Sequence, residues 1–298
     1  ELPASRPQSN PGPERRYNMG GNSFLEDIKE YLGGEVAAGI DQRVAQLEDL
    51  KELDGSDYDA FGASRETLKD IMHAVYFFYR FYFRTETHGL ENVAGLKRAL
   101  ITPNHMVQVP VDGVNLAAAL FFEPEEPRLV RAIGHHVLAS NPFANMFISR
   151  SGQVIGNAGN ADRLFEEDNL VLIFPEGAGA IRPYSRRYRL NRFSPGFMEY
   201  AVKYGYPVIP TAIIGSEEST LILAEVKRLK GFLNIPRFGV SPTFPLLGPL
   251  GMIPYPVKFR IYFGEPMDFS DRKDRLDDPA AVRRMVEDVR LEVQAMLD

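Results

Sequence analysis

The sequence predicts an α/β fold, in which a mixed sheet is flanked by helices and preceded by a helical segment. From residue 90 onward, short apolar runs alternate with stretches of helical periodicity, as in sheets whose faces are covered by helices. Before that point, apolar residues recur at steps of three and four, as on amphipathic helices. In addition, His105 follows one of the apolar runs, in the loop that leads to the next helical stretch. Open α/β sheets place ligands and chemistry at that position.

Length and composition exclude several classes of protein. The chain has 298 residues, of which 44% are hydrophobic and 25% charged, as is ordinary for a globular protein. It has no cysteine, which excludes disulfides and thiolate chemistry, and its net charge of −6 argues against a nucleic-acid partner. No apolar run approaches the ~18–20 residues of a membrane-spanning helix, and the first residues lack the apolar core of a secretory signal. We therefore expect a cytoplasmic protein that is free in solution or peripheral to a membrane.

We expect three regions along the chain. Residues 1–22 are rich in Pro, Ser, Asn and Arg and poor in apolar residues, which predicts a disordered tail. Residues 23–88 form a helical segment that begins with one amphipathic helix, or with two helices hinged at Gly33-Gly34. Ser64 has the residue type and position of the N-cap of a later helix. Residues 89–298 form the α/β domain.

Within this domain, apolar runs of strand length predict strands near residues 96–102, 129–134, 153–155, 170–174, 208–214 and 257–263. Apolar residues at helical spacing predict helices over residues 113–122, 141–148, 160–167, 195–204 and 278–297, and a further helix over 219–230.

Two apolar segments admit more than one interpretation. Residues 76–84 are aromatic on all sides of a helix, which is typical of a buried helix or of one that lies on lipid with Arg80 and Arg84 reaching outward. Residues 235–256 combine many prolines with large apolar residues. Proline excludes a helix or a central strand there, so the segment packs on the domain, lines an apolar channel or contacts a bilayer.

His105 and Asp112 have the parts of a catalytic base and the acid that orients it. The histidine comes directly after Asn104 at the end of a predicted strand, and the aspartate lies a short loop away, before the next predicted helix. A carboxylate beside an imidazole fixes the tautomer of the ring and stabilises its charged form. The simpler alternative is a loop histidine that only caps a neighbouring backbone group.

Four blocks of residues occur in a fixed order. They are Asn104-His105 with Asp112, residues 147–152 with Arg150, residues 171–177 ending in Pro-Glu-Gly, and Pro207-Val208-Ile209-Pro210. In this order they resemble the blocks of the glycerolipid acyltransferases of the lysophosphatidic acid type, which are His-x4-Asp, an arginine block, Phe-Pro-Glu-Gly and a proline-rich strand. The resemblance covers about residues 90–269 and implies the glycerol-3-phosphate acyltransferase-like fold.

The first block departs from the family's pattern. Six residues, not four, separate His105 from Asp112, and Pro110 stands where the family has its aspartate. Asp112 reaches the histidine if residues 109–111 bulge. This spacing resembles a branch related to diacylglycerol-acyltransferase-like members, so it affects the expected acceptor more than the expected chemistry.

The resemblance implies transfer of a fatty acyl group from an acyl thioester, acyl-CoA or acyl carrier protein, to a hydroxyl of a lysophospholipid or other glycerolipid. His105 would be the general base and Asp112 its orienting acid, and the reaction needs no metal and no cofactor. The other residues expected to contact substrate are Asn104, Arg150, Glu176, Gly177 and Arg187. A membrane surface is the expected partner besides the donor and acceptor.

Several of these residues have alternative roles. Arg150 would bind an acceptor phosphate or form a structural ion pair, and Glu176 would hold an acceptor hydroxyl or anchor its loop. Arg187 belongs to a basic stretch, residues 182–192, that is either a solvated face or a patch for phosphates. For the whole protein, two rivals remain: a thioesterase or lysolipid hydrolase, and a non-enzymatic, membrane-associated lipid-binding protein on the same fold.

Overall fold

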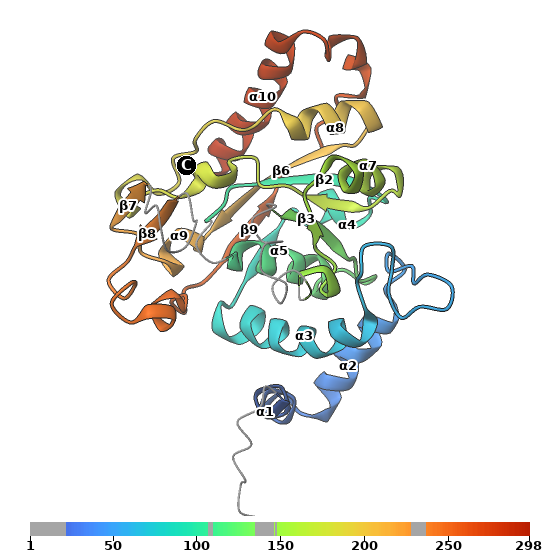
Figure 1. The fold of residues 1–298 in the computed structure, drawn as a ribbon, viewed down its shortest axis with the longest axis vertical. Coiled ribbons are helices and arrows are strands. Elements are labelled where there is room, and N and C mark those ends of the chain that lie inside the picture. Colours follow the sequence, from blue (N-terminus) through green and yellow to red (C-terminus); the bar gives the residue numbers. More distant parts are fainter. Residues whose placement is uncertain (1–21, 107–109, 135–145, 147, 228–236) are drawn as a thin grey trace, which may run out of the picture.

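The computed structural model describes residues 22–106, 110–134, 146, 148–227 and 237–298. In these residues the main sheet has seven strands, in the order β1-β9-β6-β2-β5-β3-β4 (Figure 1). The strands are β1 (Glu86–His88), β2 (Ala99–Pro103), β3 (Val130–Gly134), β4 (Val154–Ile155), β5 (Leu170–Leu172), β6 (Val208–Ile214) and β9 (Arg260–Phe263). The six strands predicted for the α/β domain are all present, and β1 is an addition.

Five neighbouring strands run in the same direction. β2 pairs in parallel with β5 and β6, and β3 pairs in parallel with β5 and β4. β9 is antiparallel to β6, and β1 is parallel to β9, so the predicted mixed sheet is confirmed. Because β6, β2 and β5 are adjacent and parallel, the loops that follow these three strands lie next to one another at one edge of the sheet.

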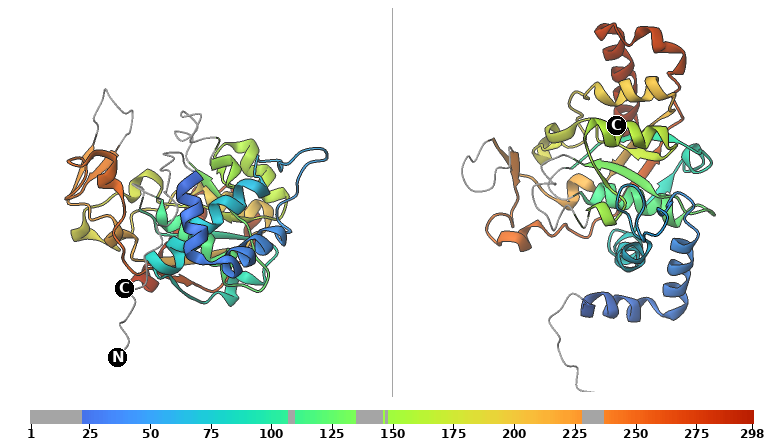
Figure 2. Two further views of the ribbon diagram at one scale, coloured as in Figure 1. Left: turned by 90° about the horizontal axis from the view of Figure 1, so that it is seen from below. Right: turned by 45° about the vertical axis from the view of Figure 1, so that its right-hand side comes forward.

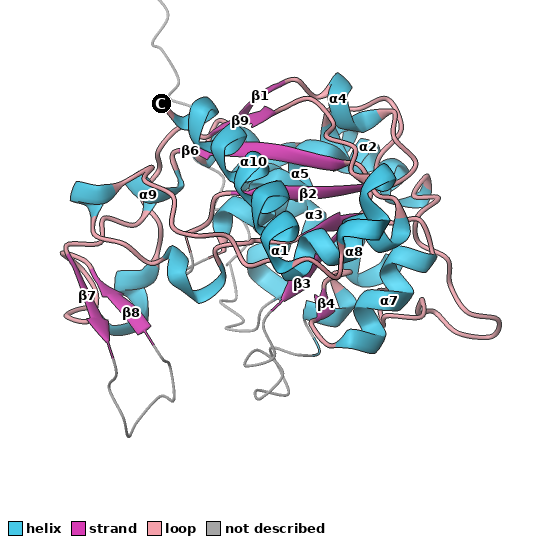
Figure 3. Cartoon of the chain, turned by 90° about the horizontal axis from the view of Figure 1, so that it is seen from above, coloured by secondary structure: helices cyan, strands magenta, loops and turns pink. Residues whose placement is uncertain are grey.

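Helices cover both faces of the sheet (Figures 1 and 3). On one face α7 (Ala158–Glu166), α8 (Gly196–Tyr204) and α10 (Pro279–Leu297) pack on Leu100 and its neighbours. On the other face, α5 (Val111–Phe122) and the π-helical turn η1 (Phe78–Tyr82) pack on Ile101 and its neighbours. Consecutive residues of β2 thus face opposite helical layers, as the alternation of side chains along a strand requires.

The N-terminal helices pack on the second of these layers. α1 (Asn22–Leu32) and α2 (Gly34–Ala45) are separate helices, because Gly33 between them has φ +82°, a value that favours glycine. The next helix, α3 (Arg65–Phe77), begins as predicted, since the Ser64 side chain accepts a hydrogen bond from the Thr67 backbone N–H. α3 packs with α2 through buried side chains of both helices and runs on into η1.

The aromatic segment, residues 76–84, is buried only in part. In η1 and the residue after it, Tyr79 and Phe83 are buried whereas Phe81 is exposed, so the segment is not uniformly buried.

The division of the chain at residue 88 stays a prediction. β1, which ends at His88, already pairs with β9 of the main sheet. No helix among the described residues is long and apolar enough to cross a membrane.

One predicted helix is wrong. The sequence pattern predicts a helix over residues 219–230, but α9 (Ser216–Ser219) ends where that helix should begin. The strand β7 (Ala224–Lys227) follows and pairs antiparallel with β8 (Arg237–Val240). This pairing involves residues ten or more positions apart, which a local helical pattern does not reveal. Residues 1–21 of the predicted tail and most of the helix predicted over residues 141–148 lie outside the described residues, and Asn22, the last residue of that tail, begins α1.

The segment expected to be irregular contains β8 and then the 3-10 helix η5 (Gly248–Met252). β8 pairs only with β7 among the described strands, which agrees with the exclusion of a central strand. Figure 2 shows β7, β8 and η5 together on one side of the molecule, away from the N-terminal helices. The segment that joins β6 to α9 leads into this part of the chain.

That connection depends on Gly215, which has φ +108°. A Cβ at this position would lie 2.5 Å from the Lys258 carbonyl oxygen, so both the backbone conformation and the space favour glycine.

We expect Gly215→Ala to lower the free energy of unfolding by about 2 kcal/mol or more, because the alanine combines a strained φ with a backbone clash. Gly196→Ala is the matched control, since Gly196 lies in α8 with open space around its Cβ position. It should be neutral or stabilising by up to ~1 kcal/mol. Urea denaturation measures both, and equal stability of the two variants would contradict the expectation.

Candidate active site

His105 and Asp112 are in direct contact at the carboxyl end of β2. The Nδ1 atom of His105 lies 2.8 Å from Oδ2 of Asp112. The predicted contact therefore forms in spite of the longer spacing, although residues 107–109 between the two lie outside the described residues. Asp112 is fully buried and the His105 side chain is 12% exposed, so the ring lies between the carboxylate and solvent. This is the order in which an orienting acid, a base and a substrate must lie.

Asp112 lies in the first turn of α5, where the helix dipole favours negative charge. Its Oδ2 atom also accepts a hydrogen bond of 2.7 Å from the Met106 backbone N–H, and its Oδ1 atom accepts one of 2.8 Å from the Gly113 N–H. These donors fix the position of the carboxylate. Since they occupy part of its lone pairs, the orientation left for the imidazole is fixed as well.

The His105 ring is also held from one face. It stacks on Phe174 with a centroid separation of 3.8 Å and an interplanar angle of 22°. No hydrogen bond to its Nε2 atom is found among the residues that the structure describes. With Nδ1 donating to Asp112, Nε2 carries a lone pair and can accept a proton from a bound hydroxyl.

Glu176, in the Pro-Glu-Gly block, anchors its own loop. Arg182 donates two hydrogen bonds of 2.9 Å to the two Glu176 oxygens, and the Asn191 backbone N–H donates a third, of 2.8 Å. Of the two roles expected for this carboxylate, the structure shows the anchoring one. Gly177 has φ +52°, and its N–H donates to the Phe174 carbonyl, so this N–H is not free to contact a substrate.

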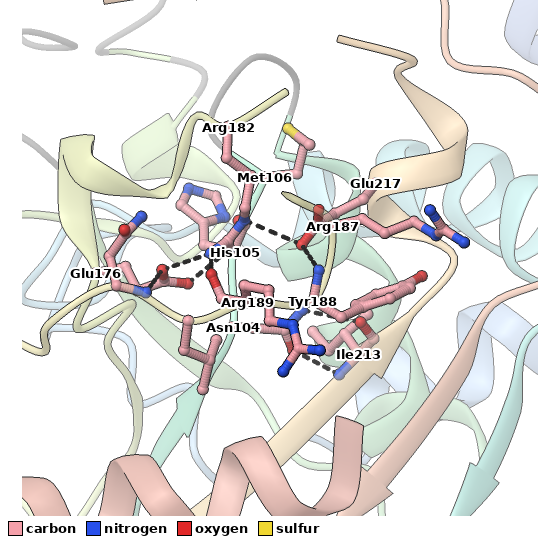
Figure 4. A network of polar contacts seen from close by, with 12 residues as sticks. Asn104, His105, Met106, Glu176, Arg182, Arg187, Tyr188, Arg189, Ile213 and Glu217 are labelled. Atoms are coloured by element: carbon pink, nitrogen blue, oxygen red, sulfur yellow. Dashed lines mark hydrogen bonds and ion pairs between the residues drawn. The ribbon is translucent and has the colours of Figure 1, made fainter. Parts of the chain in front are cut away.

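Arg182 is the residue on which this part of the site is built (Figure 4). Besides its forked contact with Glu176, its Nε atom lies 3.2 Å from Oε1 of Glu217, which follows β6. It also donates to the backbone carbonyls of Arg189, at 2.6 Å, and of His105, at 3.5 Å. The Arg182 side chain is almost fully buried. One guanidinium therefore joins the loops that follow β2, β5 and β6.

Arg182 and Glu217 are the site residues that sequence reasoning missed. The sequence groups Arg182 with the exposed arginines of residues 182–192, and it places Glu217 beside a segment expected to be helical. The signal available was position: Glu217 follows the carboxyl end of a predicted strand, as His105 and Glu176 do. Charged residues that follow adjacent parallel strands lie close together. Local sequence does not give the strand order that makes β2, β5 and β6 neighbours, because that order depends on tertiary contacts.

Glu217 is buried with incomplete hydrogen bonding. Its Oε1 accepts from the Tyr188 backbone N–H at 3.1 Å, while its Oε2 has no partner among the described residues. Burial raises the pKa of Glu217 to about 7, and the Arg182 guanidinium and the Tyr188 N–H oppose that rise only in part. The Glu217 carboxyl therefore holds its proton to a higher pH than an exposed glutamate does.

Two predicted site residues do not face His105. Asn104 is fully buried, and its side chain donates to the Ile213 carbonyl at 2.9 Å and accepts from the Ile213 N–H at 2.7 Å. It therefore joins β2 to β6, and because it is fully buried it presents no group to a substrate. Arg150 precedes β4, which runs parallel to β3, β5, β2 and β6, so it lies near the edge where these five strands begin. There it stacks over Tyr58, and its carbonyl accepts from the Ser64 N–H that starts α3.

The basic stretch divides into one buried and four exposed arginines. Arg182 is buried, whereas the exposed ones are Arg186, Arg187, Arg189 and Arg192. Arg187 stacks over Tyr184, with its guanidinium 4.6 Å from the ring centroid, and lies 3.9 Å from a Glu218 oxygen. Figure 4 shows Arg187 and Arg189 on the segment that passes beside His105. All four side chains are exposed to solvent, and in Figure 4 the guanidinium of Arg187 points away from His105.

Comparison with known proteins gives one family model, described as Acyltransferase, which matches residues 84–214. An uncharacterized protein of Mycobacterium leprae is 34% identical over 291 residues, covering 95% of this chain and 78% of that protein. An uncharacterized protein of Mycobacterium tuberculosis is 35% identical over 224 residues, and the match covers 74% of this chain and 63% of that protein. Among solved structures, the 1-acyl-sn-glycerophosphate acyltransferase of Thermotoga maritima matches over 93% of this chain and 94% of its own, with 17% identity and a TM-score of 0.46.

We expect Glu217→Gln to change how stability depends on pH. Native Glu217 keeps its proton up to about pH 7, whereas an unfolded glutamate releases it near 4.5. Between these values the native state binds more protons than the unfolded state. The stability from this site is therefore full below pH 4.5 and is lost as the pH rises towards 7. Glutamine has no such proton, so relative to wild type the variant should gain on the order of 2–3 kcal/mol between pH 4.5 and pH 8.

Urea denaturation at these two pH values measures the effect. Glu199→Gln is the control for the loss of one carboxylate, since Glu199 lies exposed on α8. If both variants respond to pH alike, Glu217 does not carry the proton assigned to it.

Proposed function

Because the chain belongs to the acyltransferase family, we propose that it moves a fatty acyl group from an acyl thioester to a hydroxyl of a glycerolipid. The observation that supports this most is the His105–Asp112 pair, with Nδ1 2.8 Å from the buried carboxylate and Nε2 unbonded among the described residues. An alcohol is a poor nucleophile until a base removes its proton as it attacks. The pair supplies that base, and no serine or cysteine nucleophile is required.

The proposed reaction has two proton transfers, both through His105. The acceptor hydroxyl gives its proton to Nε2 while its oxygen bonds to the thioester carbonyl carbon. The carbon–sulfur bond then breaks, and the leaving thiolate takes the proton from the imidazolium. Asp112 keeps Nδ1 protonated throughout and stabilises the imidazolium that forms between the two steps. The reaction as written uses neither a metal nor a cofactor.

We assign the phosphate of the donor or acceptor to the exposed arginines beside the site. Arg187 has a planar guanidinium that can grip a phosphate with two hydrogen bonds, and its contact with Glu218 is too long to compete strongly. Arg150 is a weaker candidate than the sequence suggested, because it lies near the opposite edge of the sheet from His105. A peripheral position on the membrane follows from the acceptor's chemistry.

Thiol release from a panel of acyl-CoAs tests the proposal, with lysophosphatidic acid, other lysolipids or diacylglycerol as acceptors. Release that requires a glycerolipid supports the transferase, and the product identifies the acceptor. Release without any acceptor points to the hydrolase. If neither acyl-CoA nor acyl carrier protein donors release thiol, the protein is a lipid-binding scaffold on this fold.

His105→Ala should lower acyl transfer at least ~100-fold, because the acceptor loses its base. The control is His88→Ala. His88 is an exposed histidine of β1 that stacks on Tyr262, and the variant without it should retain full activity. Circular dichroism of both variants checks the fold. Full acyl-transfer activity of His105→Ala would contradict the proposed mechanism.

Asp112→Asn should lower transfer by a factor on the order of 100–10,000. In the wild type, Oδ2 of Asp112 accepts from the Met106 N–H and from Nδ1 of His105, while Oδ1 accepts from the Gly113 N–H. An amide has only one carbonyl oxygen, so its NH₂ group opposes donors either at the Oδ2 position, where it forces the wrong tautomer on the ring, or at the Oδ1 position; in both cases the negative charge that stabilises the imidazolium is lost. The pH profile of kcat/KM, measured for wild type and variant, separates this loss of an oriented base from a loss of folded protein. An unchanged kcat/KM would mean that another group orients the ring.

A further inference from the structure

Between α9 and β9 the chain forms a separate lobe, which consists of β7, β8 and η5 within residues 224–253. In Figure 1 it lies at the lower left, beside α9 and away from the helices α8 and α10 at the top. The catalytic site proposed above does not use this lobe. Its base nevertheless adjoins that site, since Ile222 packs in a small buried cluster with Met106 and Ile181.

Large aliphatic side chains project from η5 and from the residues next to it. Leu246 is 85% exposed, Leu247 58%, Leu250 70% and Ile253 59%. We call these four residues the leucine patch. Single exposed leucines are common on protein surfaces, but four large aliphatic residues within eight positions mark a site of interaction.

Hydrogen bonds within the segment and to its neighbours hold the patch in place. Thr243 donates from its hydroxyl to the Gly251 carbonyl at 2.9 Å, and the Ser241 hydroxyl accepts from the Phe244 N–H at 2.9 Å. On the far side, the Tyr82 hydroxyl donates to the Pro254 carbonyl at 2.7 Å. The leucines are thus presented on a preorganised turn, and little conformational entropy is left to lose on binding.

The sequence around the patch carries charge of one sign. From Val226, which follows Glu225, to Gly264 it contains six lysines and arginines and no aspartate or glutamate, in a chain of net charge −6. Two of the six, Lys258 and Arg260, pair with Glu86. The other four lie in β7, in β8 or in the sequence between these strands, and Lys227 and Arg237 are opposite each other in the register.

We propose that the leucine patch inserts into the surface of a bilayer that contains anionic lipids, with the β7–β8 hairpin over the headgroups. Aliphatic side chains gain from burial at the acyl boundary, and nearby cations gain from anionic headgroups. A protein partner or a second copy of this chain would bury the leucines equally well. The absence of carboxylates from residues 226–264 favours the lipid, because a second copy would bring the same cations against each other.

The proposal rests on the proposed function for one point, that the acceptor is a membrane lipid. Through Ile222, the lobe connects the bilayer surface to the loop that carries Met106 and His105. Docking by the leucine patch would therefore place the base close to the lipid from which the acceptor is drawn.

The chain has no tryptophan, so a single introduced one reports on its own position. Leu246→Trp is the probe and Leu291→Trp the matched control, since Leu291 is a 51% exposed leucine on α10. Each is titrated with vesicles of phosphatidylcholine and phosphatidylglycerol that carry brominated acyl chains. We expect a blue shift and quenching of the residue-246 emission, weaker in high salt, and no change at residue 291. No change at residue 246 would overturn the proposal.

Vesicle sedimentation is the second measurement. The triple variant Leu246→Ser/Leu247→Ser/Leu250→Ser should partition at least ~10-fold less onto these vesicles than wild type, whereas Leu291→Ser should match wild type. Equal partitioning of all three proteins overturns the proposal. A blue-shifted residue-246 emission without vesicles, together with a dimer in solution, also overturns it in favour of a second copy.

His105→Ala separates this proposal from the proposed function, because its vesicle binding should equal that of wild type whatever its activity. Normal binding of wild type without any acyl transfer contradicts the function alone. Acyl transfer to a dispersed lysolipid, combined with absent vesicle binding, contradicts the leucine patch alone.

Discussion

A single buried guanidinium holds the edge of the sheet at which the candidate site is built. Arg182 donates hydrogen bonds to Glu176 after β5 and to the His105 carbonyl after β2, and it forms an ion pair with Glu217 after β6. Three loops from three adjacent parallel strands therefore meet on one side chain. Because the five donors of arginine lie in a fixed plane, they fix directions as well as distances. This guanidinium contacts the backbone of His105, at 3.5 Å, whereas Asp112 orients the ring, at 2.8 Å.

Such a cluster has a definite energetic character. Burying a charged triad is costly, and its net contribution to stability is small, but the loss of one member leaves an uncompensated charge in the interior. The raised pKa of Glu217 reflects the same balance, since one guanidinium does not compensate for two buried carboxylates. The cluster is thus better understood as a device that orders the loops than as a source of stability.

The proposed chemistry and the leucine patch belong to one part of the molecule. The segment after β6 carries first Glu217, then Ile222 beside Met106, and then the lobe with its exposed leucines. A substrate with an acyl chain and a polar head needs an apolar surface and a polar, catalytic site close together. Along this segment, about 40 residues join Glu217 and Ile222, which lie beside the loops of the candidate site, to the leucine patch.

Local patterns in the sequence were enough to predict the α/β class, the six strands of the α/β domain and the pairing of His105 with Asp112. These local patterns are apolar runs of strand length, apolar residues at helical spacing, and a histidine and an aspartate on either side of one loop. Other features depended on contacts between distant parts of the chain. The β7–β8 hairpin replaced a predicted helix because strand pairing over ten or more residues outweighs local periodicity. The strand order β6-β2-β5 brought Arg182 and Glu217 to His105 and left Arg150 near the other edge. The order of the strands in space decides which charged residues contact one another, and local sequence patterns do not reveal that order.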